Sequence, residues 1–369
     1  MNDLDGISTP AWESTMNTSV KQQIENGMID IELVFLVFAF IMVAVGLVGN
    51  VVIIISGLRL PMTRKKGVTT GSRYYIINLA SADLCVLIVY SVTDLTPLLH
   101  PWGLGDFMCK ALLPLRDVFL IVSLVTITTL SLERYWLITR PLQHQGNKSI
   151  AKVVLVFIWI ASYLVNGLPL LLLTRLVNTQ DGVICMLKYP SVLHMKVHVG
   201  FGIAIILIPF LIVTFCYVAI GITLQNVYKK HSQNMLHGYD EAGNKHTVTL
   251  ILRSKRLVKV LIVLLVAFAI CNLPVVLYVL AHFFYKFEQF EHQKTLYTFF
   301  QCMMVYGSGV NPLILLLMAS EYRLCIVELK EMLRKLCTGF CGGSRLGKER
   351  PDQPYCAMLQ DKNIPTTPV

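Results

Sequence analysis

Charged residues are scarce in this 369-residue sequence, whose 32 basic and 22 acidic side chains make up only 15% of the chain. A soluble domain carries roughly 25% charged residues, so this deficit indicates that lipid surrounds much of the chain. The net charge of +10 alone would also suit a nucleic-acid-binding protein. The basic residues, however, lie in short clusters between apolar runs, which is typical of a protein at a membrane surface.

Motifs of catalytic and metal sites are missing as well. The sequence has no H-E-x-x-H or G-x-S-x-G motif, so we do not expect an enzyme. Its ten cysteines include no zinc-type C-x-x-C pair. No internal repeat is evident, which disfavours a transporter. Residues 1–30 lack the apolar core of a cleavable signal peptide, so we expect the first span to direct its own insertion.

Seven apolar runs are long enough to form membrane-spanning helices, since about 20 helical residues cross the roughly 30 Å of hydrocarbon. They cover residues 33–55, 75–99, 107–138, 153–173, 198–227, 257–284 and 295–318. We therefore predict an all-α membrane protein, a seven-transmembrane helix bundle followed by a short amphipathic eighth helix. The expected organisation is an outer tail at 1–30, the bundle at 31–318, the eighth helix at 319–337 and an inner tail at 338–369.

The loop charges predict the orientation of the bundle. Lysine and arginine gather in the loops after spans one, three and five and in the segment after span seven, whereas the other loops hold few. The positive-inside rule then places the N-terminus outside the cell and the C-terminus in the cytosol. The sequon at Asn17 would be glycosylated on the outer side, and the sequon at Asn147 would stay unmodified in the cytosol.

Each span also carries an element that resembles the rhodopsin-like (class A) G-protein-coupled receptors. In order, these elements are Gly49-Asn50-Val51-Val52, Asn78 to Leu84, Cys109 with Glu133-Arg134-Tyr135, Trp159 with Pro169, Pro209 with Tyr217, Phe268 with Cys271-Asn272-Leu273-Pro274, and Asn311-Pro312. Together they cover about residues 30–335. The resemblance implies a multi-pass receptor of the plasma membrane that binds an extracellular ligand, promotes nucleotide exchange on a heterotrimeric G protein and is recognised by arrestin.

Asp83 lies inside span two, where an unpaired charge would cost about 2.5–3.5 kcal/mol, so it must face other helices. Four polar residues of spans one, three and seven can converge on it, namely Asn50, Ser123, Ser308 and Asn311. In the family that this chain resembles, such a cluster holds a sodium ion, and no other cofactor is expected. A hydrogen-bonded network without an ion is the alternative. Gly307 stands where the family usually has an asparagine, which weakens the sodium interpretation.

The resemblance implies that the inner half of the bundle couples the receptor to its G protein. Arg134 would pair with Glu133 at rest and meet the G protein when span six moves outward. The alternative is an interfacial arginine that snorkels to the lipid surface. Pro274 allows a kinked hinge in span six. The residues assigned to coupling and activation are Glu133, Arg134, Tyr135, Tyr217, Leu124, Pro209, Phe268, Pro274 and Pro312, of which Leu124, Pro209 and Phe268 would form the family's central triad.

Two residues depart from the family pattern at the activation switch. Asn272 replaces the tryptophan of the C-W-x-P motif, and Leu315 replaces the tyrosine of N-P-x-x-Y. Tyr217 thereby loses the partner that the family pattern implies. Either activation is stabilised differently here, or the receptor couples weakly or to arrestin alone.

The ligand pocket is expected at the outer ends of spans two, three and six. Arg116 occupies the position at which amine receptors carry an aspartate, and span seven has no lysine to hold retinal. The candidate pocket residues are Asp94, Arg116, Asp117, Tyr278 and His282. Such a discontinuous polar wall favours a peptide, either a neuropeptide or a peptide hormone. A lipid or small organic acid paired with Arg116 is the alternative, and Asp94 or Asp117 could simply pair with Arg116.

The second outer loop carries two predictions. Cys109, at the start of span three, and Cys185, in this loop, would both face the oxidising side and are expected to form a disulfide. Residues 176–187 show a hairpin-like pattern around Asp181-Gly182. That pattern resembles peptide receptors.

The segment after span seven carries an apolar stripe opposite basic residues, so it is expected to lie along the inner leaflet. Cys337 and Cys341 just beyond it are candidate palmitoylation sites, with free thiols as the alternative. The terminal Thr367-Pro368-Val369 has the shape of a ligand for a PDZ protein, which would capture its carboxylate and final valine by strand addition.

Overall fold

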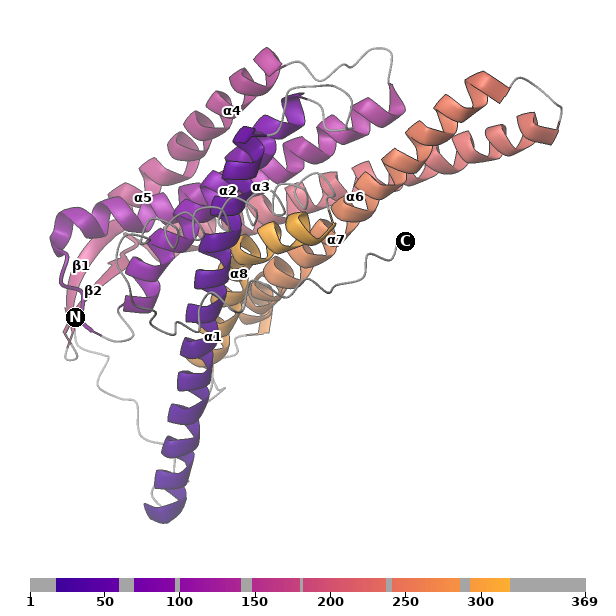
Figure 1. The fold of residues 1–369 in the computed structure, drawn as a ribbon. Coiled ribbons are helices and arrows are strands. Elements are labelled where there is room, and N and C mark those ends of the chain that lie inside the picture. Colours follow the sequence, from indigo (N-terminus) through magenta and orange to yellow (C-terminus); the bar gives the residue numbers. More distant parts are fainter. Residues whose placement is uncertain are drawn as a thin grey trace, which may run out of the picture.

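The computed structural model describes residues 18–59, 70–96, 100–140, 148–179, 182–236, 241–285 and 293–318 (Figure 1). Its helices are α1 (Thr18–Arg59), α2 (Thr70–Tyr90), α3 (Gly105–Thr139), α4 (Lys148–Ser162), α5 (Leu168–Leu173), α6 (Val192–Leu236), α7 (Glu241–Tyr285) and α8 (Gln293–Met318). Several predictions lie outside the described residues, namely those for Asn17, Asn147, the eighth helix at 319–337, Cys337, Cys341 and Thr367 to Val369.

Seven stretches of these helices are long and apolar enough to cross a membrane. They are Leu36–Leu58, Gly71–Leu95, Gly105–Thr139, Lys148–Leu173, Val192–Lys229, Ile262–His282 and Thr298–Met318. The prediction of seven spans is therefore confirmed. The helices α1, α6 and α7 continue beyond their apolar stretches, and in Figure 1 α6 and α7 run on together past the rest of the bundle.

The outer surface of the bundle is apolar. Large hydrophobic side chains point away from the core, with Phe157 69%, Leu172 66% and Leu317 71% exposed. In water a contiguous surface of this kind would promote aggregation, whereas hydrocarbon is its natural surrounding. Polar side chains such as Asn50 and Asp83 are instead buried between the helices, because lipid offers them no hydrogen-bonding partner.

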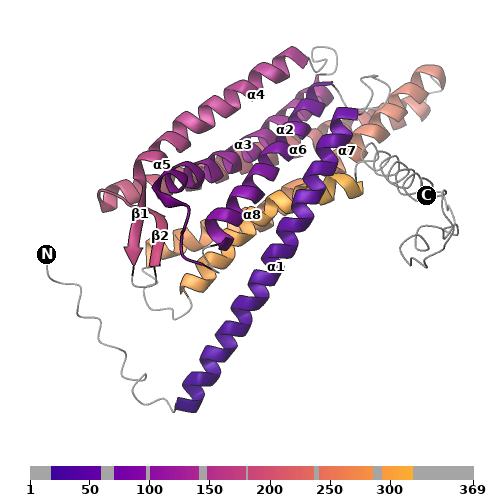
Figure 2. The same cartoon turned by 60° about the vertical axis from the view of Figure 1, so that its left-hand side comes forward.

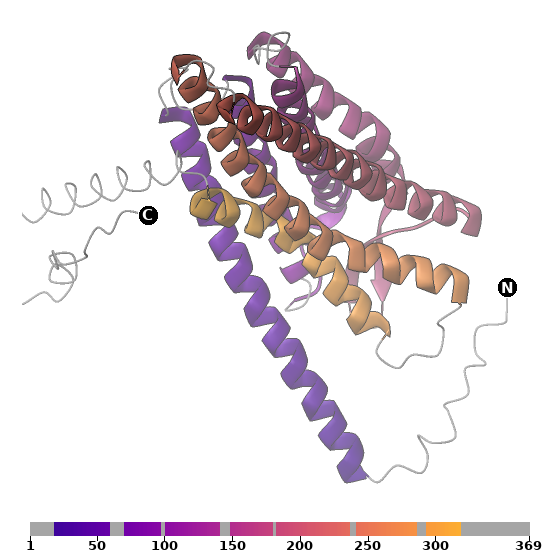
Figure 3. The same cartoon turned by 90° about the vertical axis from the view of Figure 1, so that its right-hand side faces the viewer.

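The helix α3 runs through the middle of the bundle and packs against α2, α4 and α6, while α1 packs against α2 and α8 (Figure 2). Figure 3 shows α1 and α8 side by side. Glycine permits this contact, because a Cβ added at Gly46 would lie 2.8 Å from the Cα of Gly309 and 2.6 Å from Cδ1 of Leu87. Small residues at such crossings let membrane helices approach closely and gain van der Waals contact.

Two spans contain a π-helical turn, which widens the helix by one residue and rotates the residues after it about the helix axis. One is η2 (Ser91–Leu95), which continues α2, and the other is η4 (Tyr163–Gly167), between α4 and α5. The turn η2 contains Asp94, one of the predicted pocket residues. Such turns often occur at functional sites.

A two-stranded antiparallel hairpin joins the fourth and fifth spans. Its strands are β1 (Thr174–Thr179) and β2 (Gly182–Leu187), with Thr174 opposite Leu187 and Thr179 opposite Gly182. Gly182 has a φ of +121°, which favours glycine, and a Cβ at this position would lie 2.9 Å from Pro101. The hairpin predicted from the sequence is confirmed. It lies at the opposite end of the bundle from the extended ends of α6 and α7 (Figure 1).

Candidate functional site

The polar core forms around Asp83, which is fully buried in α2. Ser123 of α3 donates its hydroxyl to Oδ1 of Asp83 at 2.6 Å, and the Asn311 amide of α8 donates to Oδ2 at 2.9 Å. Ser308 also lies within hydrogen-bonding reach of the carboxylate. Three of the four predicted partners therefore gather on Asp83. Each carboxylate oxygen has a second lone pair for a further partner.

Asn50 joins this core by a different route from the one predicted. Its Nδ2 donates to the backbone oxygens of Gly46 at 2.9 Å and of Ser308 at 3.1 Å. It therefore links α1 to α8 rather than bonding directly to Asp83. Its side chain is 1% exposed, so both bonds form away from solvent, where an unmade hydrogen bond is costly.

A cavity of about 40 Å³ lies beside the polar core and is enclosed by α3, α7 and α8. Its polar lining includes Ser123, Ser308 and Asn311, which also contact Asp83. About 10–15 Å³ is enough to hold one water, so this cavity has room for more than one. Leu124 and Phe268, two members of the predicted central triad, line its apolar side, and the third member, Pro209, lies inside α6.

The end of the bundle that is predicted to face the cytosol, called the inner end, carries the Glu133-Arg134-Tyr135 segment on α3. Arg134 is 6% exposed, so this arginine does not extend freely to the lipid surface. Glu133 accepts a hydrogen bond from the hydroxyl of Ser72 on α2. The ring of Tyr135 lies 6.0 Å from that of Phe215 on α6.

Tyr217 has a partner that sequence reasoning missed. Its hydroxyl lies 2.6 Å from the hydroxyl of Ser131, one helical turn before Arg134 on α3. Leu315, which replaces the tyrosine of the family pattern, is 5% exposed and packs in the same hydrophobic cluster as Tyr217. A serine or threonine facing a tyrosine across two spans is the only sequence signal of this bond, and such pairs are frequent by chance.

A second missed network ties α2, α3 and α4 together. Asn78 donates its Nδ2 to Oγ1 of Thr126 at 2.9 Å and accepts at Oδ1 from the Trp159 indole, also at 2.9 Å. Both Asn78 and Trp159 belong to the motifs noted in the sequence. Their pairing fixes the rotation of α4 against the bundle.

The opposite end of the bundle, which is predicted to face the outside and is called the outer end, carries a charged triad. Arg116 of α3 donates through Nη1 to both carboxylate oxygens of Asp94, at 2.7 and 2.8 Å, and through Nε to Asp117 at 2.9 Å. The three side chains are only 19–35% exposed. The structure thus brings together three of the five predicted pocket residues, and Asp94 and Asp117 both pair with Arg116. Tyr278 lies on α7 with its ring 5.8 Å from that of Phe300, and His282 is exposed near the end of α7.

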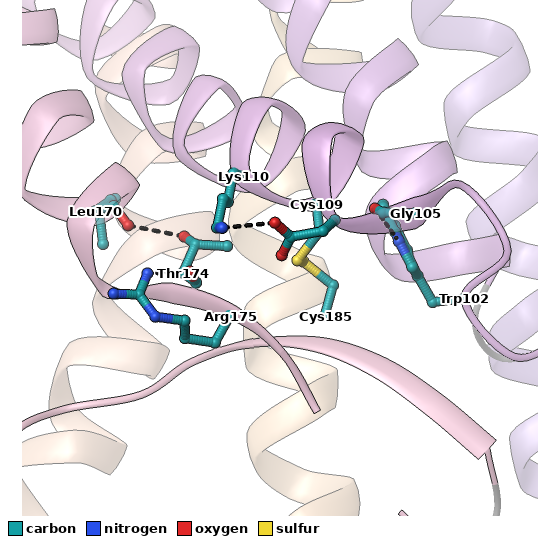
Figure 4. The surroundings of a disulfide bond; sticks show 9 residues. Trp102, Gly105, Cys109, Lys110, Leu170, Thr174, Arg175 and Cys185 are labelled. Atoms are coloured by element: carbon teal, nitrogen blue, oxygen red, sulfur yellow. Dashed lines mark hydrogen bonds and ion pairs between the residues drawn. A yellow bond between two sulfur atoms is a disulfide. The ribbon is translucent and has the colours of Figure 1, made fainter. Parts of the chain in front are cut away.

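The predicted disulfide joins Cys109 of α3 to Cys185 of β2, with Cα atoms 5.6 Å apart (Figure 4). Close to it, the Trp102 indole donates to the backbone oxygen of Gly105 at 3.0 Å, and the Trp102 amide donates to Val183 at 2.9 Å. These bonds hold the hairpin against the outer end of α3. Pro274 and Pro312 lie inside α7 and α8, as predicted.

Comparison with known proteins agrees with this architecture. The chain matches the family described as 7 transmembrane receptor (rhodopsin family) over residues 49–315. It is 29% identical over 312 residues to the G-protein coupled receptor 54 of Oreochromis niloticus, which is 80% of this chain and 77% of that receptor. It is 29% identical over 307 residues to the KiSS-1 receptor of Homo sapiens, which is 80% of this chain and 73% of that receptor. Its match to the Substance-P receptor of Rattus norvegicus is 28% identical over 242 residues, covering 63% of this chain and 55% of that receptor. The chain therefore belongs to the rhodopsin family of seven-transmembrane proteins, which are receptors and not enzymes.

Proposed function

We propose that this protein is a plasma-membrane receptor for an extracellular peptide and promotes nucleotide exchange on a heterotrimeric G protein. The observation that carries the proposal is its similarity over most of the chain to receptors named for peptides. The ligand is a neuropeptide or a peptide hormone. The assignment of the ligand class rests on these relatives, and the residues at both ends of the bundle support it.

The outer end is the peptide-binding end. Asp94, Arg116 and Asp117 form a partly exposed polar wall, and Tyr278 and His282 extend it along α7. A guanidinium that already faces two aspartates is a poor partner for a free acid, because a carboxylate ligand would bring a third negative charge to Arg116. This argues against a lipid or organic acid paired with Arg116.

The orientation places the N-terminus outside and the C-terminus in the cytosol, as the loop charges require. The disulfide supports this orientation, because the bond persists on an oxidising side of the membrane. Asn17 is then glycosylated. The proposed eighth helix at 319–337 lies on the inner leaflet, Cys337 and Cys341 carry palmitate, and Thr367 to Val369 bind a PDZ protein. The tails are 1–30 and 338–369, on either side of the bundle at 31–318.

The inner end is the coupling end, where Glu133, Arg134 and Tyr135 meet the G protein or arrestin. Because Tyr217 bonds to Ser131, the α3–α6 contact does not depend on the tyrosine that Leu315 replaces. Activation then moves α7 about Pro274, with Leu124, Pro209, Phe268 and Pro312 repacking. This favours ordinary G-protein coupling over coupling to arrestin alone.

The polar core binds an allosteric sodium ion. Hard cations prefer oxygen ligands, and Asp83 supplies a full negative charge whose described hydrogen bonds come from neutral donors. Ser123, Ser308 and Asn311 line the adjacent cavity, and Asn50 holds the Ser308 backbone in place. Among the residues described, no group of three histidine, cysteine or acidic side chains is arranged for a metal such as zinc.

The test is nucleotide exchange on a panel of purified G proteins with the receptor in lipid nanodiscs. Peptides of the KiSS-1, substance-P and QRFP types, taken from the names of the relatives, serve as probes. We expect at least one to accelerate exchange, and Arg134→Ala to abolish the effect without loss of surface receptor. Arrestin recruitment without exchange would replace the proposal by the arrestin-only alternative, and glycosylation at Asn147 instead of Asn17 would overturn the orientation.

A further inference from the structure

Asn272 of α7 and Gly307 of α8 line the same cavity beside the polar core. Both depart from the pattern of the family, which has a large aromatic residue at the first position and an asparagine at the second. Both unusual residues therefore line one cavity, which Ser123, Ser308 and Asn311 also line.

The amide of Asn272 has a defined orientation. Its Nδ2 donates to the backbone oxygen of Phe268 at 2.9 Å. Since that partner is a carbonyl, only the nitrogen of the amide can face it, so the assignment of nitrogen and oxygen is not ambiguous. Among the residues that the structure describes, no donor reaches Oδ1 of Asn272. A partly buried carbonyl oxygen with no protein donor beside a cavity indicates a partner that the protein does not supply, either water or a cation.

Gly307 leaves room on the other side. A Cβ added at this glycine would lie 3.5 Å from Cβ of Cys271 and 3.9 Å from its Sγ, which is ordinary van der Waals contact. Nothing in the packing therefore requires glycine here. Gly307 itself lines the cavity, so the amide that is absent from α8 is matched by the amide that Asn272 brings from α7.

We propose that Asn272 supplies, through Oδ1, an oxygen ligand for the sodium ion of the polar core or for its water, in place of the amide that is missing at position 307. This rests on the proposed sodium site at Asp83. The charge comes from Asp83, the hydroxyls and amide of Ser123, Ser308 and Asn311 complete the polar wall, and Asn272 closes it from α7. Exchanging the aromatic residue for asparagine thus preserves an ion site that Gly307 alone would weaken.

The experiment measures thermal unfolding of the purified full-length receptor in increasing NaCl, with choline chloride holding the ionic strength constant. Asn272→Leu removes the oxygen and keeps a side chain branched at Cγ, although leucine is the larger residue, and Asn272→Ala is the second variant in case leucine impairs folding. We expect either one to raise the half-saturating sodium concentration about tenfold. Adding Gly307→Asn to Asn272→Leu should restore the response to sodium, because it returns an amide to the cavity from α8.

Asp83→Asn separates this inference from the sodium site on which it rests. If Asp83→Asn abolishes the sodium response but Asn272→Leu and Asn272→Ala leave it unchanged, the role of Asn272 is overturned and the sodium site stands. If the unsubstituted receptor responds equally to sodium and choline, both are overturned, while the exchange assay still tests the receptor function. If the double variant of Asn272→Leu and Gly307→Asn does not regain the response to sodium, an amide at position 307 cannot replace the amide of Asn272.

Discussion

The hydroxyls of Ser131 and Tyr217 lie 2.6 Å apart and join α3 to α6 on the helical turn that precedes Arg134. Ser131 also lies 2.9 Å from the backbone oxygen of Ile127, which can only accept, so both bonds form together when Tyr217 is the donor to Ser131. We assign the bond in this direction. This direction makes the two ends of the bond unequal. Removing the Ser131 hydroxyl leaves the buried Tyr217 hydroxyl without an acceptor, whereas removing the Tyr217 hydroxyl leaves Ser131 still bonded to Ile127.

Ser131→Ala should therefore destabilise the receptor more than Tyr217→Phe. A buried hydroxyl left without a partner costs about 1–3 kcal/mol, whereas the loss of a hydrogen bond whose remaining partner still has another bond costs about 0.5–1.5 kcal/mol. Thermal unfolding of the purified receptor measures the difference. Thr129→Val is the matched control, because the Thr129 hydroxyl bonds only within its own helix. A lower melting temperature for Tyr217→Phe than for Ser131→Ala would contradict the assigned donor.

The disulfide should control how much folded receptor reaches the cell surface. Cys109→Ser or Cys185→Ser opens a loop with a sequence separation of 76 residues, worth about 4 kcal/mol in the chain-entropy model. We expect surface expression, measured by flow cytometry, to fall strongly and equally in the two single variants and the double variant. Cys85→Ala, which removes a thiol outside the disulfide, should have little effect. Additive losses in the double variant would show that the cysteines act separately.

The stabilising effect of the charged triad should depend on its net charge rather than on any single salt bridge. Arg116→Gln leaves the carboxylates of Asp94 and Asp117 without their shared cation and should lower the free energy of unfolding by about 1–3 kcal/mol. Breaking a fully buried pair costs about 3–5 kcal/mol. The loss is smaller here because the side chains are 19–35% exposed. Adding Asp94→Asn should recover part of this loss in a thermal unfolding assay.

The exposed pair of Lys110 and Asp106 provides the control for the triad. Its side chains are 38% and 53% exposed, so Lys110→Gln should change the melting temperature little. If the double variant of Arg116 and Asp94 were less stable than Arg116→Gln alone, repulsion between the two carboxylates would not be the cause.

Two glycines in spans should differ sharply on replacement by alanine. At Gly46 the new Cβ meets the backbone of Gly309 at 2.8 Å, whereas at Gly200 on α6 no atom of the described residues lies within 4 Å. Gly46→Ala should separate α1 from α8 and lower the melting temperature, while Gly200→Ala should stabilise its helix by up to about 1 kcal/mol. Equal effects of the two substitutions would contradict the close crossing.

Hydropathy, turn residues and the positions of two cysteines were enough to predict most of the architecture. The seven spans, the hairpin near Gly182 and the Cys109–Cys185 bond are all present. Long apolar runs and turn residues are local signals, and the two distant cysteines were predicted to lie on the same side of the membrane. The gathering of Ser123 and Asn311 on Asp83 was also predicted, because a buried carboxylate requires polar partners and few polar residues occur in the spans.

The partners of particular side chains were harder to predict. Asn50 binds backbone oxygens, Glu133 bonds to Ser72, and Tyr217 bonds to Ser131. These pairings depend on how far each helix is rotated about its axis, which apolar composition does not determine. The π-helical turn η2 adds to the difficulty, because it changes the direction of Asp94 and contains neither proline nor glycine. The nearest such residue in the sequence is Pro97, two residues after the end of the turn.

The close crossing at Gly46 and Gly309 also has a consequence for biosynthesis. The first spanning helix to leave the ribosome makes one of its closest contacts with the last one inserted, so the contact between Gly46 and Gly309 cannot form until α8 has entered the membrane. Because α8 is synthesised after the other spans, its packing against α1 is a late step of folding. A nascent chain that stalls after α7 lacks this contact and holds α1 through its packing against α2.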